Sequence, residues 1–130
     1  MNALDTNVVV YAFEHGSRRG RALELLDAEA IISVQVLNEY ANAIRRKYAR
    51  EWKDIADDLE AIRCAVARVD PVTDDANREA LRLVERYRLA WFDAVLLAVA
   101  LAGGARTIYS EDMQHGLLID GTLRIVDPFR

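Results

Sequence analysis

A short apolar segment meets a polar cluster close to the start of this chain. Ala3 and Leu4 lead into Asp5, Thr6 and Asn7, and a second apolar run follows directly. A strand that ends in polar side chains this early is typical of the central strand of an open α/β sheet. Ligands bind beyond the carboxyl ends of such strands, where the strand order reverses. We therefore predict that Asp5 is the first of several carboxylates gathered at that edge to hold metal ions.

Along the rest of the chain, short apolar segments alternate with segments of helical periodicity. Strands are expected at residues 30–32, 65–69, 107–109 and 123–126, and helices at residues 7–13, 18–28, 34–49, 52–64, 73–87 and 89–102. This alternation predicts an α/β fold in which a parallel central sheet of about four to five strands carries helices on both faces. No linker or internal repeat divides the chain, so residues 1–130 are expected to form a single domain.

Local signals refine three of the predicted helices. Ser33 and Thr73 are placed to cap the helices that follow them, because their hydroxyl oxygens can accept first-turn N–H groups. Tyr48 falls at helical spacing with the apolar residues of the 34–49 helix and is expected on its buried face. The 89–102 helix is apolar on all sides and is therefore expected to be buried.

Composition narrows the class of protein. Cys64 is the only cysteine, so no internal disulfide can form and a cytoplasmic location is the default expectation. The longest uncharged stretch, residues 94–105, falls short of the roughly 18 to 20 residues that span a bilayer, and no secretory signal is expected.

A net charge of −4 argues against a nucleic-acid partner unless the acids cluster in a metal site. Two divalent ions would cancel four negative charges there.

Asp93 is the strongest single signal in the sequence. It is the only charged residue between Leu89 and Ala105, in a helix expected to be buried. A buried carboxylate is costly unless it is paired, hydrogen-bonded or bound to metal. Asp93 could instead accept N–H groups of the first turn of its own helix. Both interpretations are compatible with Asp93 taken alone.

Three acids are expected to meet at one edge of the sheet. Asp5 and Asp112 each follow a predicted strand, and the helix that carries Asp93 should begin at the same edge. Two unit charges about 4 Å apart repel by about 4 kcal/mol at an effective dielectric near 20, so a cation should hold such acids together. A set of carboxylates without adjoining histidine or cysteine favours Mg²⁺ or Mn²⁺ over zinc.

Other polar residues near these acids have two interpretations. Glu39 lies on the flank of the 34–49 helix, either as a further acid of the site or as a solvated glutamate. Thr6, Asn7 and Ser110 are short polar groups beside the acids, suited to orienting carboxylates or a metal-bound water. Each of them could instead be only a turn residue.

Four short segments stand in a recognisable order: LDTN at residues 4–7, VLNE at 36–39, WFDA at 91–94 and SEDMQ at 110–114. Together they resemble PIN-domain ribonucleases, and more narrowly the VapC-type toxins of type II toxin–antitoxin systems. The resemblance covers essentially the whole chain and implies a PIN-like fold. It carries the acidic quartet of that family onto Asp5, Glu39, Asp93 and Asp112, and its accessory hydroxyl onto Ser110.

The resemblance implies a metal-dependent endoribonuclease that cleaves single-stranded or structured RNA. Asp5, Asp93 and Asp112 are expected to ligate one or two Mg²⁺ or Mn²⁺ ions, with Glu39 binding metal directly or through water. A metal-activated water would then attack the phosphodiester in line. The resemblance also implies a homodimer and a cognate antitoxin whose segment wraps the toxin and blocks its acidic pocket.

Some residues depart from the family pattern or stay open. Ala90 stands where a small hydroxyl is expected to cap the Asp93 helix, and Glu111 is an alternative to Asp112 as the inward acid. His115 is expected to be an exposed loop residue. The basic segment 45–53 is a candidate for contact with RNA phosphates, or an ordinary solvated helix face. The same two interpretations apply to the arginines at 18, 19 and 21.

Three other functions share some of these sequence features with the nuclease. A haloacid-dehalogenase-type phosphatase needs a second aspartate where Asn7 stands. A receiver-type signalling module needs a lysine late in the chain, and none follows Lys53. A non-catalytic PIN-like module that binds RNA or protein is the third, and the complete acidic quartet argues against it.

Overall fold

The computed structural model describes residues 1–130 and contains one six-stranded sheet in the order β3-β2-β1-β4-β6-β5. Every neighbouring pair is parallel except β5 and β6. The predicted α/β fold with a mostly parallel sheet is therefore confirmed, with one strand more than expected. The extra strand, β5, has only two residues, too few to show an alternating pattern. The strands are β1 Asn2–Leu4, β2 Ile31–Ser33, β3 Arg68–Asp70, β4 Thr107–Tyr109, β5 Leu118–Ile119 and β6 Leu123–Val126.

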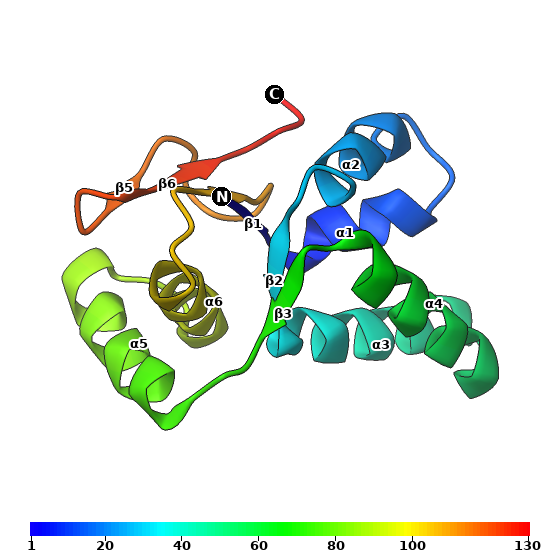
Figure 1. Cartoon of the computed structure of the whole chain (residues 1–130), viewed down its shortest axis with the longest axis horizontal. Coiled ribbons are helices and arrows are strands. Elements are labelled where there is room, and N and C mark those ends of the chain that lie inside the picture. The colour runs from blue at the N-terminus through cyan, green and yellow to red at the C-terminus, as the bar shows by residue number, and fades with distance from the viewer.

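Six helices cover both faces of this sheet, as predicted. They are α1 Thr6–Phe13, α2 Arg19–Leu26, α3 Val34–Tyr48, α4 Trp52–Ala65, α5 Asp74–Tyr87 and α6 Trp91–Ala102. Figure 1 shows α5 and α6 on one side of β2 and β3, and α1 to α4 on the other. The predicted caps are confirmed, since Ser33 accepts a hydrogen bond from the N–H of Gln35 and Thr73 accepts one from Ala76. None of these helices has both the length and the apolar character needed to cross a membrane.

The strand order reverses between β1 and β4. The chain builds β1, β2 and β3 in one direction, then returns to place β4 on the other side of β1. Leu4 is in register with Tyr109, and the N–H of Asp5 continues the ladder by bonding the Tyr109 carbonyl at 2.9 Å. Asp5 and Ser110 therefore leave the sheet side by side, at the reversal point where α/β sheets bind their ligands.

Burial differs from expectation at three aromatic residues. Residues 94–100 of α6 are buried as predicted, but Trp91 and Phe92 in its first turn are 38% and 58% exposed. The prediction of an entirely buried helix was therefore wrong at this end. Tyr48 is 52% exposed, because it is the last residue of α3 and its hydroxyl donates to Glu14 at the surface.

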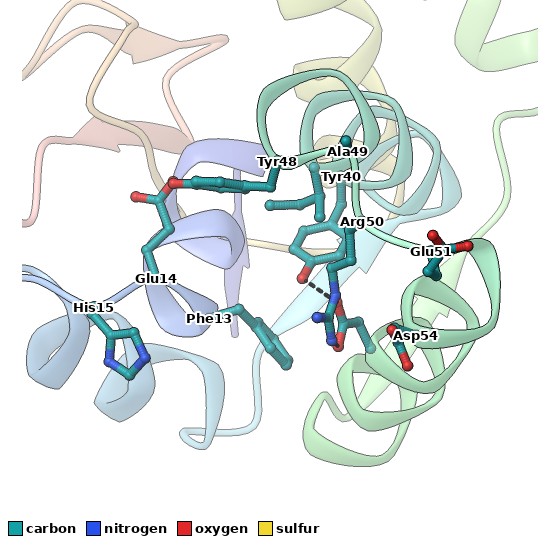
Figure 2. A pocket seen from close by; sticks show the side chains of 11 residues that line it. Phe13, Glu14, His15, Tyr40, Tyr48, Ala49, Arg50, Glu51 and Asp54 are labelled. Carbon is teal, nitrogen blue, oxygen red and sulfur yellow. Dashed lines mark hydrogen bonds and ion pairs between the residues drawn. The ribbon is translucent and has the colours of Figure 1, made fainter.

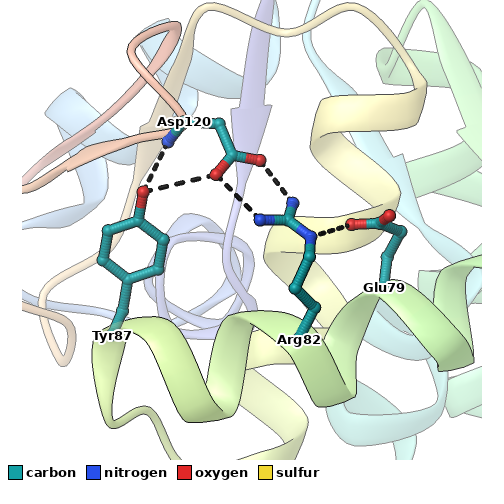
Figure 3. A network of polar contacts seen from close by, with 4 residues as sticks. All are labelled: Glu79, Arg82, Tyr87 and Asp120. Atoms are coloured by element: carbon teal, nitrogen blue, oxygen red, sulfur yellow. Dashed lines mark hydrogen bonds and ion pairs between the residues drawn. The ribbon is translucent and has the colours of Figure 1, made fainter.

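The edge hairpin of β5 and β6 is fixed to α5 by a polar network (Figure 3). Arg82 donates to both carboxylate oxygens of Asp120 in the hairpin turn, and also to Glu79 on its own helix. The hydroxyl of Tyr87 donates to the Asp120 carboxylate and accepts from the Asp120 N–H. This anchoring matters for the site, because the end of β6 accepts the N–H of Ser110 at 3.0 Å through the carbonyl of Val126.

Candidate active site

Asp5 lies buried at the end of β1 and has two roles. As the N-cap of α1, its Oδ1 accepts the N–H of Thr6 at 2.7 Å. Its Oδ2 accepts the hydroxyl of Ser110 at 2.7 Å and the amide of Asn7 at 3.4 Å. Asp5 therefore caps α1 with one oxygen, and its second oxygen faces the neighbouring strand end.

Ser110 folds the loop after β4 back toward Asp5. Its fully buried hydroxyl oxygen accepts the N–H groups of Asp112 and Met113, each at 3.2 Å. Asn7 then bridges the two acids, because its amide donates to Oδ2 of Asp112 at 3.0 Å as well as to Asp5. The structure thus brings together Asp5, Asn7, Ser110 and Asp112, as the strand-end argument predicted.

Glu39 also points toward this edge from the second turn of α3. Thr6 donates its hydroxyl proton to Oε2 of Glu39 at 2.7 Å, and Gln35 donates to Oε1 at 3.2 Å. The interpretation of Glu39 as a freely solvated glutamate was therefore wrong. The contact of Gln35 was not predicted, although its i,i+4 spacing to Glu39 is the signal that could have revealed it.

Asp93 is half-buried in the first turn of α6. Its carboxylate accepts no hydrogen bond from that turn, whose N-cap Ala90 also provides no side-chain cap. Burial raises the pKa of Asp93, and the negative charges of Asp112 and Glu39 raise it further. Asp93 is therefore not a helix cap, and it is close enough to the other acids to feel their charge.

Burial and mutual repulsion among the acids of the cluster raise the pKa of Asp5 and of Asp93. The pKa of Asp5 is raised to about 6, chiefly by burial, with Asp93 and Glu39 adding to the effect. The hydrogen bonds from Ser110 and Thr6 oppose that rise because they stabilise the charged form. No lysine, arginine or histidine forms an ion pair with Asp5, Glu39, Asp93 or Asp112. No protein cation is therefore paired with the cluster.

The donor chemistry of this cluster fits a hard divalent cation, because every acidic group offers carboxylate oxygens and no thiolate or imidazole is among them. In the structure, however, the acids of the cluster are too far apart to surround a single ion. No three side chains among histidine, cysteine, aspartate and glutamate lie close enough together to hold one ion. Asp5 and Asp112 share the Asn7 amide as a donor, whereas Glu39 is held by Thr6 and Gln35.

A family model described as PIN domain matches residues 3–115 of the chain. The chain belongs to the PIN domain family. No curated protein sequence matches it. The family match spans β1 through the loop after β4, and so includes every member of the acidic cluster.

Solved structures share the fold of this PIN domain over most of its length. A toxin–antitoxin complex from Klebsiella pneumoniae is 20% identical, with 98% of each chain covered and a TM-score of 0.69. VapC20 of Mycobacterium tuberculosis, described as a sarcin-ricin loop cleaving toxin, is 22% identical over 86% of this chain and 92% of its own, with a TM-score of 0.69. VapBC2 from Rickettsia felis, bound to a promoter DNA fragment, is 20% identical over 97% and 98%, with a TM-score of 0.69. At this level of identity the likeness establishes the fold.

The structure distinguishes the two neighbouring acids after β4. Asp112 faces Asn7, whereas Glu111 turns away to form an ion pair with Arg18 at 2.9 Å and to accept the hydroxyl of Tyr11 at 2.5 Å. Asp112 is therefore the acid that points toward the cluster in this PIN domain, as chosen from the sequence. His115 is exposed, as expected, and its Nδ1 accepts the N–H of Asp127. It forms no hydrogen bond or ion pair with the acids.

A cavity of about 650 Å³ in the PIN domain is separate from this cluster (Figure 2). It lies where the end of α1 meets the junction of α3 and α4, and contains none of the four predicted acids and none of the accessory polar residues. Its polar wall is a structural clamp, because Asp58 accepts the hydroxyl of Tyr40 at 2.9 Å and two donors of Arg50 at 2.8 Å. Two of the acids, Glu39 and Asp112, instead line a second groove of about 430 Å³ between α1 and α3.

Proposed function

We propose that this PIN domain is a metal-dependent endoribonuclease that cleaves single-stranded or structured RNA. The observation that carries the proposal is the convergence of Asp5, Glu39, Asp93 and Asp112 without a basic side chain among them. Repulsion among these carboxylates is unfavourable by itself, and bound divalent cations would offset it. Membership of the PIN domain family supports the nuclease over a phosphatase or a receiver module.

In this proposal, Asp5, Asp93 and Asp112 hold one or two Mg²⁺ or Mn²⁺ ions, and Glu39 binds metal directly or through water. The metal supplies a Lewis acid that lowers the pKa of water and stabilises developing charge on the phosphate oxygens. The protein side chains orient the acids: Ser110 holds Asp5, and Thr6 holds Glu39. Asp112 is exposed, and Asn7 is the only side chain that donates to its carboxylate.

We further propose that the protein is the toxin of a type II toxin–antitoxin pair, cytoplasmic and homodimeric. The similar structures from Klebsiella pneumoniae and Rickettsia felis are toxin–antitoxin proteins, which supports a cognate antitoxin as partner. The similar VapC20 is described as cleaving the sarcin-ricin loop, which supports structured RNA as one substrate class. Trp52 and Phe92 are 60% and 58% exposed, and exposed aromatic side chains of this size are common at protein interfaces.

The test is a cleavage assay on single-stranded and hairpin RNA with Mg²⁺, with Mn²⁺ or with EDTA. Wild type should cleave only with metal, and Asp93→Asn should lose activity by at least about a hundredfold. Asp75→Asn is the matched control, because Asp75 is an exposed acid in the first turn of α5 with no ion pair, and it should cleave like wild type. Equal activity of Asp93→Asn and Asp75→Asn would refute the assignment.

The alternative is a non-catalytic PIN-like module that binds RNA or protein. The absence of a closed three-ligand set in the structure is the observation that favours it. RNA binding by the wild type without cleavage under either metal would decide for this alternative.

A further inference from the structure

The groove that Glu39 and Asp112 line continues well past these two acids. Its walls are one face of α1, with Glu14 just beyond the end of that helix, and one face of α3, from Glu39 to Lys47. Asp112, which accepts a hydrogen bond from Asn7, also lines the groove. On α3 the lining residues Glu39, Asn42, Ala43 and Arg46 follow the 3, 4 and 7 spacing of a single helix face. Arg46 therefore lies about 10 Å along the helix axis from Glu39.

At the far end of the groove, one positively charged side chain has no partner within the protein. Lys47 is neutralised by Glu14, its Nζ lying 3.0 Å from the Glu14 carboxylate. Arg46 is exposed and forms no ion pair, side-chain hydrogen bond or cation–π contact within the protein. Asn42, one turn closer to the acids, is likewise exposed. A guanidinium with five free donors at the end of a polar groove is suited to an anion.

We propose that Arg46 and Asn42 form a subsite for the RNA backbone, beside the phosphate that is cleaved. The inference rests on the proposed nuclease function and assigns its substrate-binding residues. A polyanion that enters a groove with acids at one end meets repulsion, and Arg46 is the groove cation left free to offset it. Arg46 contacts a neighbouring phosphate through two parallel N–H donors, while the Asn42 amide bonds phosphate or ribose oxygen. The subsite positions the strand without reading its sequence.

The experiment measures binding of a fluorescent single-stranded RNA oligonucleotide by anisotropy, in the Asp93→Asn background so that the RNA stays intact. Arg46→Ala should raise Kd about tenfold and flatten the slope of log K against log salt by about 0.7, the contribution of one phosphate contact on a single strand. Arg46→Lys should recover only part of the affinity, because lysine keeps the positive charge but lacks the two parallel N–H donors of the guanidinium. Asn42→Ala should raise Kd about threefold.

Arg106→Ala is the matched control. Arg106 is an exposed arginine just before β4, at the opposite end of that strand from Ser110, and it forms no ion pair. Its substitution should leave Kd and the salt slope unchanged. In the background with intact acids, Arg46→Ala should raise KM about tenfold with kcat within about twofold, as expected for a residue that binds substrate and transition state alike.

The outcomes separate this subsite from the proposed function. If wild type cleaves RNA and Arg46→Ala matches Arg106→Ala in Kd and salt slope, the subsite is wrong and the nuclease stands. If wild type cleaves nothing but binding still depends on Arg46, the nuclease is wrong and the subsite stands. Absence of RNA binding by the Asp93→Asn protein would overturn the subsite.

Discussion

The hydroxyl of Ser110 donates a 2.7 Å hydrogen bond to Oδ2 of Asp5, across the ends of two adjacent parallel strands. The same oxygen accepts the N–H groups of Asp112 and Met113, so one buried atom orders the first acid of the chain and the loop that carries the last. The structure therefore makes Ser110 the centre of the acidic site, although the serine has no charge of its own.

Replacement of that hydroxyl should be costly. Ser110→Ala would leave two N–H groups without their acceptor and Asp5 without a donor, and should lower the free energy of unfolding by about 2 to 3 kcal/mol. It should also raise the pKa of Asp5 further, because the Ser110 hydrogen bond lowers it. Denaturant unfolding and an NMR titration of the Asp5 carboxyl measure the two effects. Ser17→Ala, at an exposed loop serine, is the control and should change neither.

Stability should depend on pH through Asp5. Its pKa is about 6 in the folded protein and near 3.8 in the unfolded chain, so the folded state binds the proton more tightly. The stability that Asp5 contributes is thus complete below about pH 3.8 and is lost as pH rises through about 6. The loss corresponds to roughly 3 kcal/mol at neutral pH.

Asp5→Asn removes this titration. In EDTA at pH 7.5 the variant should be more stable than wild type by about 1 to 2 kcal/mol, since its amide avoids the charge penalty but fits the Ser110 donor less well. Near pH 4 the advantage should vanish. Urea unfolding at both pH values measures the difference, and a gain that is the same at pH 4 and pH 7.5 would contradict the origin assigned to it.

Glu111 should act on the site at a distance. Its contacts with Arg18 and Tyr11 hold the loop after β4, next to Asp112 in the chain. Glu111→Ala should lower kcat for RNA about fivefold and the free energy of unfolding by only about 1 kcal/mol, because the Arg18 side chain is half exposed. Glu24→Ala, which breaks an exposed pair with Arg21, is the control; an equal kcat in the two variants would show that Glu111 does not order the site.

The α3–α4 clamp should serve stability alone. Asp58→Asn weakens the hydrogen bonds from Arg50 and Tyr40 and should cost about 2 kcal/mol, with RNA cleavage per folded molecule unchanged. The neighbouring exposed Asp57→Asn should cost nothing measurable. Thermal unfolding and cleavage rates on the same samples test both statements, and lost cleavage in a folded Asp58→Asn protein would connect this cavity to the activity.

The convergence of Asp5, Ser110 and Asp112 could be predicted because parallel strands bring their carboxyl ends to one edge whatever the rest of the chain does. Glu39 could not be placed in the same way. Its position depends on how α3 packs beside α1 and on the hydroxyl of Thr6, contacts that leave no periodic signal. The family resemblance, and not the residue pattern, brought Glu39 into the predicted site.

The fold was predictable where local chemistry decides it, as at the caps Ser33 and Thr73. It was not predictable where a tertiary neighbour decides. The hydropathy of Trp91 and Phe92 does not reveal that the first turn of α6 lacks a covering element, and the exposure of Tyr48 follows from the distant Glu14. The strand expected at residues 65–69 lies at Arg68–Asp70, because α4 extends to Ala65.

The central claim is that acids distant in sequence form one divalent-metal site, and anomalous scattering from crystals soaked in Mn²⁺ tests it most directly. The account predicts an Mn²⁺ peak about 2.1 Å from a carboxylate oxygen of Asp5 and of Asp93 or Asp112, and its loss in crystals of Asp93→Asn. Fully occupied Mn²⁺ elsewhere on the protein, with none between Asp5 and Asp93, would contradict it.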